Sequence, residues 1–168
     1  MMAQDSGFSA GLDLAMPMGN TADVFSFGVG PMVSYEREAG GSGLAGVSVA
    51  YTIMFPKEDF IKSGAIIPLQ AHYKYFFDDI REGAYIGVMF GYGISTFKTE
   101  DIAGMDGEST SNAGLGLAPV VGYVLNERID LGLRYQIILT SDSNDGTVSS
   151  GGSSTSLPYI GLRAAYNF

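Results

Sequence analysis

The sequence predicts an all-β protein: a transmembrane, eight-stranded, antiparallel up-and-down β-barrel, formed by one domain over residues 1–168 with residues 1–6 as an N-terminal tail. Three observations support this prediction. Large apolar residues alternate with small or polar ones along eight segments, which is the period of a β-strand with two different faces. Charged residues make up only 16% of the chain and glycine occupies 24 of its 168 positions, unlike an ordinary soluble domain. No apolar run approaches the ~18 residues that a membrane-spanning helix needs.

The predicted strands are bounded by turn residues. In order they run over residues 7–18, 24–36, 44–55, 65–77, 84–97, 112–125, 129–140 and 157–168. At ~3.3 Å per residue and a tilt near ~40°, about ten to twelve residues cross an apolar layer of ~25 Å. An even number of strands places both termini on the same side, as closure of an up-and-down barrel requires.

The last strand shows the alternation most clearly. One of its faces carries Ile160, Leu162, Ala164, Tyr166 and Phe168, and the other carries Gly161, Arg163, Ala165 and Asn167. In the earlier segments the bulky face continues with residues such as Phe8, Phe25, Phe27, Tyr51, Leu69, Tyr92, Leu117 and Leu133. The opposite face holds the glycines within strands, namely Gly11, Gly28, Gly30, Gly46, Gly87, Gly91, Gly93, Gly114, Gly116, Gly122, Gly132 and Gly161.

This distribution predicts which face points outward. The interior of an eight-stranded barrel just holds ordinary side chains, so it has no room for the whole bulky face. A water-facing surface of glycine, alanine and serine with few charges would also be unusual for a soluble protein. We therefore expect the bulky face to contact lipid and the small face to line the lumen. The alternative is a soluble β-sandwich or lipocalin-like barrel with the bulky face inward.

Loop lengths predict the orientation. Short connections follow the even-numbered strands at residues 78–83 and 126–128, whereas residues 56–64, 99–111 and 141–156 form longer ones after odd-numbered strands. Outer-membrane barrels have short periplasmic turns and long external loops. We therefore expect a bacterial outer-membrane location with both termini in the periplasm. The start of the chain has neither the basic nor the apolar part of a signal peptide.

The predicted lumen face carries a set of polar residues. By parity along the strands these are Asp13, Glu36, Gln70, His72, Lys74, Asp130, Arg134, Gln136, Arg163 and Asn167. Asp13 and Arg163 lie on the first and last strands, which are neighbours in a closed barrel, and Arg134 lies at a similar height. We expect a buried Arg–Asp network here, because buried charges must be paired. The simplest role of this set is to fill the lumen. A gate or narrow polar path is the functional alternative, and large residues such as Met32, Met54, Met89, Phe76 and Tyr85 favour a closed plug.

Composition and motifs argue against several other functions. The net charge of −9 disfavours nucleic-acid binding. The chain has no cysteine and one histidine, and His72 has no partners at metal-site spacing. We expect no metal, no cofactor and no enzyme activity. The predicted outer loops carry the acids Glu100, Asp101, Asp106, Glu108, Asp142 and Asp145, for which a cation or partner contact is the alternative to a solvated loop.

Five prolines fall within the predicted strands: Pro17, Pro31, Pro68, Pro119 and Pro158. Proline removes a hydrogen-bond donor from a ladder, and a closed barrel has no edge strand to accommodate it. We therefore expect these residues at strand ends, rims or bulges.

Over essentially its whole length the chain resembles the eight-stranded outer-membrane barrels of the OmpA transmembrane domain and OmpX kind. Its final residues resemble the C-terminal signal of that family, with Tyr166 and Phe168 serving as assembly signal and aromatic girdle. The resemblance implies three kinds of partner: outer-membrane lipid and lipopolysaccharide, the outer-membrane assembly machinery, and a protein partner at the external loops. The functions of that family are diverse, and we expect a structural or surface-interaction role, adhesin-like or in envelope integrity, through the external loops. A narrow pore and a lipid-modifying enzyme are the alternatives.

Overall fold

A computed structural model describes residues 6–57, 61–99, 109–141 and 154–168. The described part of the chain contains one short helix, α1 (Thr21–Val24), and nine strands. The strands are β1 (Ser6–Pro17), β2 (Phe25–Glu38), β3 (Gly43–Ala50), β4 (Thr52–Pro56), β5 (Ile61–Phe76), β6 (Gly83–Thr99), β7 (Ser109–Leu125), β8 (Ile129–Ser141) and β9 (Ser154–Asn167). No helix among these residues is long and apolar enough to cross a membrane.

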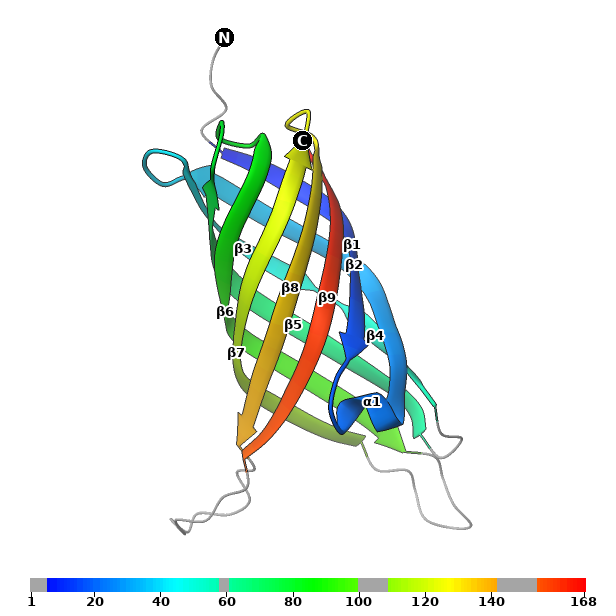
Figure 1. Cartoon of the computed structure of the whole chain (residues 1–168). Helices are drawn as coiled ribbons and strands as arrows, with labels where there is room; N and C mark the ends of the chain where they lie inside the picture. Colours follow the sequence, from blue (N-terminus) through cyan, green and yellow to red (C-terminus); the bar gives the residue numbers. More distant parts are fainter. Residues whose placement is uncertain (1–5, 58–60, 100–108, 142–153) are drawn as a thin grey trace.

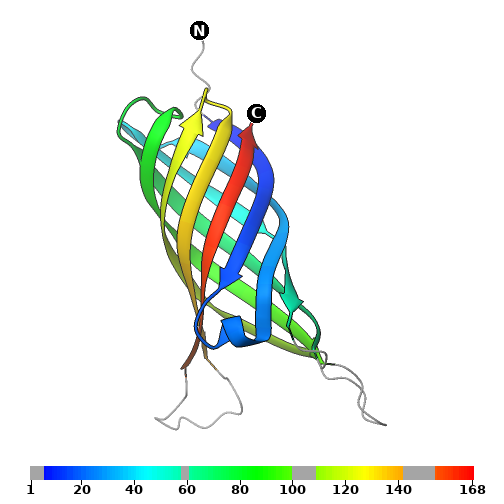
Figure 2. The same ribbon diagram turned by 45° about the vertical axis from the view of Figure 1, so that its right-hand side comes forward.

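The strands form one closed antiparallel barrel (Figures 1 and 2). β1 pairs with β2 on one side and with β9 on the other, and this double pairing closes the sheet. We call each of the strand positions around the barrel a stave. β3 and β4 together form one stave, since both pair with β2 and β5 in the same register on either side of Tyr51. The barrel therefore has eight staves, and the predicted all-β, eight-stranded fold is confirmed.

Observed strand ends extend beyond several predicted ones. β5 begins at Ile61, β6 ends at Thr99 and β7 begins at Ser109, whereas the sequence predicted 65, 97 and 112. β1 already includes Ser6, which the sequence placed in the tail. Ladder pairing continues past the apolar layer into residues such as Ser63, Lys98 and Ser109, where the apolar alternation that marked the strands has ended.

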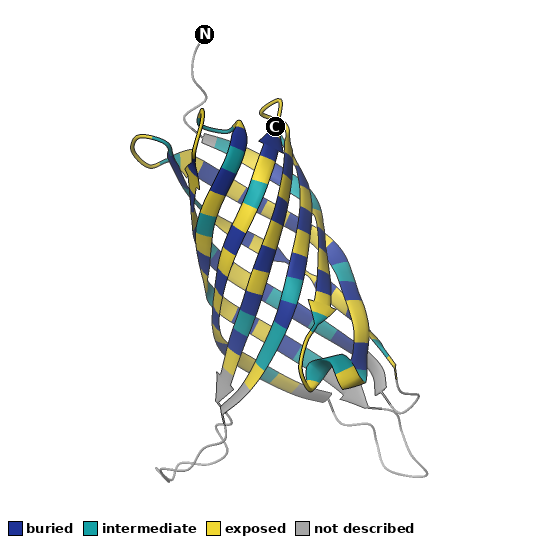
Figure 3. Ribbon diagram, viewed as in Figure 1, coloured by how far each residue is buried: buried dark blue, intermediate teal, exposed yellow. Residues whose placement is uncertain are grey.

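Burial alternates along each strand, as Figure 3 shows. Large apolar side chains on the outer surface include Leu12, Leu69, Phe90, Tyr92, Leu115 and Leu117, each more than half exposed. Phe25 was predicted on this outer face, and that prediction is wrong. A register shift between Phe25 and Phe27 reverses the alternation at this point, in the manner of a β-bulge, and Phe25 points inward with 4% of its surface exposed.

The third stave is interrupted where two prolines flank it. Pro31 of β2 lies opposite Tyr51, and its carbonyl accepts the Tyr51 N–H at 3.0 Å. In an antiparallel pair the N–H and C=O of one residue point the same way, so the nitrogen of Pro31 also faces Tyr51 and has no hydrogen to donate. The β3–β5 register places Pro68 opposite Ala50, where the alternation predicts the same loss.

The proline expectation was therefore wrong for Pro31 and Pro68, which lie within their strands. Pro119 is also internal: the β7–β8 ladder lacks pairings between Leu117 and Val120, although the register is the same on both sides. Pro17 ends β1, and Pro158 lies near the start of β9. Because the ladder on the other side of each internal proline continues, the barrel tolerates the lost donors.

Glycines on the inner face make room for the large side chains of the lumen. A Cβ atom at Gly122 would lie 2.4 Å from the Tyr85 ring, and one at Gly161 would lie 2.7 Å from Nε of Arg134. Apolar clusters also fill the interior, and two of them are large. One contains Leu44, Phe76, Tyr85, Met89, Ala118, Val120 and Val124, and the other contains Ala15, Phe25, Met54, Ile66, Ile138 and Tyr159.

Short turns and the start of β1 lie at the same end of the barrel as the end of β9, and α1 lies at the opposite end (Figure 1). The β7–β8 turn is the tightest of them. Asn126 and Glu127 have positive φ angles of 49° and 60°, and the Arg128 N–H donates to the Leu125 carbonyl at 3.0 Å. This is a two-residue hairpin turn, and it places Arg128 at the rim.

Candidate functional site

The barrel brings nine of the ten predicted lumen residues into its interior. Those nine are all buried: Asp13, Glu36, Gln70, His72, Lys74, Asp130, Arg134, Gln136 and Arg163. The five large apolar residues expected there, Met32, Met54, Phe76, Tyr85 and Met89, are buried as well. Each of these residues occupies a strand position whose side chain points into the barrel, so its placement follows directly from the two-residue repeat of a strand.

Asn167 is the exception. It is partly exposed at the rim, and its Nδ2 donates to the Glu127 carbonyl at 3.1 Å. Its position at the last residue of β9 puts it above the lumen, where it holds the β7–β8 turn against β9. The sequence-based assignment of Asn167 to the lumen network was therefore wrong, although its inner parity was right.

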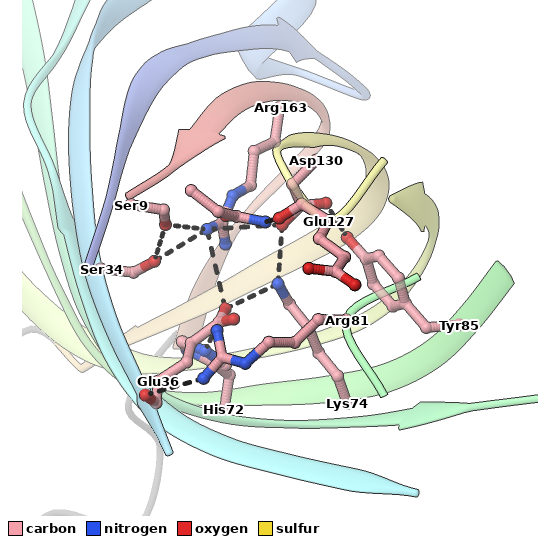
Figure 4. Close-up of polar contacts among 11 residues, drawn as sticks. Ser9, Ser34, Glu36, His72, Lys74, Arg81, Tyr85, Glu127, Asp130 and Arg163 are labelled. Atoms are coloured by element: carbon pink, nitrogen blue, oxygen red, sulfur yellow. Dashed lines mark hydrogen bonds and ion pairs between the residues drawn. The ribbon is translucent and has the colours of Figure 1, made fainter. Parts of the chain in front are cut away.

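Four charged side chains form the lumen ion-pair cluster: Glu36, Lys74, Asp130 and Arg163 (Figure 4). Lys74 Nζ lies 2.6 Å from Glu36 Oε1 and 2.7 Å from Asp130 Oδ2. Arg163 Nη2 lies 3.6 Å from Asp130 Oδ2 and 3.9 Å from Glu36 Oε1. Two carboxylates and two cations balance one another. The cluster connects β2, β5, β8 and β9 across the lumen.

Neutral side chains complete the hydrogen bonding of this cluster. Arg163 Nη2 donates to Ser34 Oγ at 2.8 Å and to Ser9 Oγ at 3.2 Å. Tyr85 Oη donates to Asp130 Oδ1 at 2.7 Å. His72 Nε2 lies 3.0 Å from Glu36 Oε1. Ser9 and Ser34 were not among the polar residues predicted for the lumen, and Tyr85 was expected there only as a large space-filling side chain. Their inner parity was the available signal, but parity does not show which groups meet across the barrel.

A second, separate pair joins Asp13 to Arg134. Arg134 Nη2 donates to Asp13 Oδ2 at 2.5 Å and to Tyr159 Oη at 3.4 Å, while Thr52 Oγ1 donates to Asp13 Oδ2 at 3.5 Å. Asp13 and Arg163 are neighbours in the β1–β9 register, as the sequence suggested. Nevertheless, among the described side chains Asp13 forms its ion pair with Arg134 and not with Arg163.

Two glutamines form a third contact in the lumen. Gln70 Nε2 donates to Gln136 Oε1 at 2.9 Å, and Gln136 Nε2 lies within 3.5 Å of the carbonyls of Leu117 and Ile137. This neutral pair joins β5 to β8 without contributing charge.

The spaces that remain differ greatly in size. At the rim that carries the short turns, a vestibule of about 490 Å³ is lined by residues that include Glu38, Arg81, Glu127, Arg128 and Asn167. Deeper in, a cavity of about 10 Å³ is lined by His72, Lys74, Met89, Val120, Gly132, Arg134 and Arg163. The inner cavity has room for roughly one water molecule.

His72 is buried in the lumen beside the ion-pair cluster. It is 3% exposed, its Nε2 contacts Glu36, and no hydrogen bond between it and a serine hydroxyl occurs among the described side chains. Nucleophilic catalysis requires such a base–nucleophile contact. Within the same residues no three His, Cys, Asp or Glu side chains gather into a metal-binding group. The loop acids Glu100, Asp101, Asp106, Glu108, Asp142 and Asp145 lie outside the described residues.

The fold of this chain is similar to that of several solved structures. Ail, the attachment invasion locus protein of Yersinia pestis, is similar with a TM-score of 0.65 and 15% identity over 97% of both chains. The N-terminal β-barrel domain of Pseudomonas aeruginosa OprF is similar with a TM-score of 0.57 and 13% identity over 98% of both chains. Neisserial surface protein A gives a TM-score of 0.56 and 14% identity over 98% of this chain and 96% of that one.

The fold is that of the eight-stranded outer-membrane barrels. No family model and no curated protein matches the sequence, so the likeness is one of architecture, at identities where side-chain roles do not transfer. The last strand ends with two aromatic residues on the outer face. Tyr166 and Phe168 are exposed on the outer face, with ring centroids 5.2 Å apart in an edge-on arrangement.

Proposed function

We propose that this protein is an integral outer-membrane barrel with a closed lumen, which serves the envelope structurally or as a surface-interaction protein through its external loops. The observation that carries the proposal is the position of Lys74 between Glu36 and Asp130. An ammonium that joins carboxylates from two other staves holds the lumen together across its width.

The outer surface supports the membrane location. Large apolar side chains cover it on all staves, and exposure of such an area to water would be unfavourable by ~25 cal/mol per Å². Short turns are typical of the periplasmic side, and they lie at the same end as the start of β1 and the end of β9. We therefore place both termini in the periplasm.

Side-chain packing supports closure against ions. A hydrated ion cannot enter a cavity of about 10 Å³. Its entry would require the buried ion pairs to separate, and breaking a buried ion pair strongly destabilises a protein. The apolar cluster of Phe25, Met54, Ile66, Ile138 and Tyr159 with Ala15 lies beyond the charged residues, toward the α1 end. It adds a mainly apolar barrier, which offers an ion little to replace its water of hydration.

A surface role is supported by the similar structures and by the architecture. Ail is named as an attachment invasion locus protein and the neisserial protein as a surface protein, and binding commonly resides in loops carried by a rigid scaffold. Ail has also been crystallised with the heparin analogue sucrose octasulfate. The net charge of −9 here disfavours a polyanionic ligand, so we infer a different partner chemistry for this chain.

Single-channel recording in a planar lipid bilayer tests the closed lumen. We expect the refolded protein to insert without steady conductance, and Asp13→Ala or Arg163→Ala to introduce conductance by removing one member of a buried contact set. Steady conductance of the unaltered protein that changes with these two substitutions would support the narrow-pore alternative and overturn closure. Protease protection of the inserted barrel serves as the control for correct insertion in each case.

A further inference from the structure

The outer wall of the barrel has a hollow near the rim that carries the short turns. Its volume is about 810 Å³, and it extends across β1, β9, β8, β7 and β6. Its lining is almost entirely apolar and includes Leu12, Tyr123, Leu131, Leu133, Leu162 and Ala164. All six side chains belong to the outward face.

Small residues create this hollow. Ala164 on β9 lies between Leu131 of β8 and Leu12 of β1 in the sheet register, so a methyl group is flanked by two leucines. Ala84 on β6 lies beside Tyr123 of β7 in the same way. The alanines between large side chains leave a hollow in the wall. An alkyl chain in this hollow makes more van der Waals contacts than it would on a flat surface.

A pair of polar side chains lies at the end of the hollow nearest the rim. Arg128 is exposed, and its Nη1 donates to the hydroxyl of Tyr166 at 3.0 Å. Tyr166 is two residues beyond Ala164 on the same outward face of β9, and Ile129, its partner in the register, follows Arg128 directly. A guanidinium and a phenol therefore lie together just beyond the apolar lining. Arginine has the donor geometry to bind a phosphate through two hydrogen bonds.

We propose that this surface is a binding site for one glycerophospholipid, with an acyl chain in the hollow around Ala164 and the phosphate on Arg128 and Tyr166. The proposal rests on the proposed membrane location and goes beyond it, because it assigns a specific lipid position where the barrel fold alone requires only a general lipid contact. With the termini in the periplasm, the lipid belongs to the inner leaflet of the outer membrane.

Native mass spectrometry of the refolded barrel tests the site, with palmitoyl-oleoyl-phosphatidylethanolamine as the probe and diacylglycerol as the matched lipid without phosphate. We expect one tightly retained phospholipid per barrel and about tenfold weaker retention of diacylglycerol, since a charge-assisted hydrogen bond is lost. Arg128→Gln should weaken retention of the phospholipid by a similar factor. Ala164→Leu should weaken retention of both lipids, because the larger side chain fills the hollow.

Two control variants separate the site from general effects. Arg37→Gln removes an exposed arginine from β2 near the same rim, and Ala113→Leu enlarges an exposed alanine of β7 near the opposite end. Both should retain the phospholipid like the unaltered protein. Equal retention of the two lipids, no effect of Arg128→Gln, or preferential retention of lipid A would overturn the proposal. If the unaltered chain fails to fold into lipid at all, the proposed membrane function fails, and the lipid site fails with it.

Discussion

One ammonium group in the lumen lies 2.6 Å from a carboxylate of β2 and 2.7 Å from a carboxylate of β8. The parity of the strands indicated that Glu36, Lys74 and Asp130 face inward, but it could not indicate that they meet. Long side chains reach across a narrow barrel, so the contacts depend on tilt and stagger. Asp13 illustrates this, since its register neighbour is Arg163 and its ion-pair partner is Arg134.

Removal of this ammonium should be costly. Lys74→Met leaves the buried carboxylates of Glu36 and Asp130 with only the more distant Arg163, at 3.9 and 3.6 Å. We expect a loss of about 3–5 kcal/mol in the free energy of unfolding. Urea titration of the protein in lipid vesicles, followed by circular dichroism, measures this loss.

Lys57→Met is the matched control. Lys57 is exposed and its Nζ donates to the Ala22 carbonyl at 2.7 Å, so its removal should cost less than about 1 kcal/mol. Similar losses for the two variants would mean that Lys74 does not hold the lumen together.

At the scale of elements, the alternation located all eight staves, yet it missed features that depend on backbone irregularity. Phe25 faces inward because a register shift separates it from Phe27, and a one-residue slip reverses every side chain beyond it. The break in the third stave was also missed. It arises because prolines on both neighbouring strands oppose consecutive residues, Ala50 and Tyr51, and no pattern within that stave itself signals it.

Restoring one donor should strengthen this stave. Pro31→Ala provides an N–H opposite the Tyr51 carbonyl, and one additional ladder hydrogen bond should slow amide exchange of Tyr51 by about fivefold to tenfold. Hydrogen exchange followed by NMR in lipid nanodiscs measures the change.

Pro17→Ala provides the comparison, because Pro17 is the last residue of β1 and should leave the exchange of Tyr51 unaltered. Unchanged exchange in Pro31→Ala would show that the missing proline donor does not cause the break.

At the scale of the whole molecule, composition and face separation were sufficient to predict a closed barrel with its bulky face outward. Low charge content, inner-face glycines and large outward residues such as Leu69, Phe90 and Leu117 all require the same arrangement. The outer hollow around Ala164 was not predicted, because it needs the relative heights of residues on five staves. The long loops carry no motif in their sequence that would predict a partner.

The outward face in lipid is the central claim, and single-cysteine labelling tests it most directly because the chain has no cysteine of its own. Leu117→Cys places a thiol on the outer face at the middle of β7, and Asn126→Cys places one in the exposed turn between β7 and β8. The test uses a charged, water-soluble thiol reagent and protein in lipid vesicles, with the turn accessible to the reagent. We expect rapid modification of Asn126→Cys and at least about a hundredfold slower modification of Leu117→Cys, since a charged reagent does not enter hydrocarbon. Rapid modification of Leu117→Cys in the folded, vesicle-bound protein would place the bulky face in water and contradict the account.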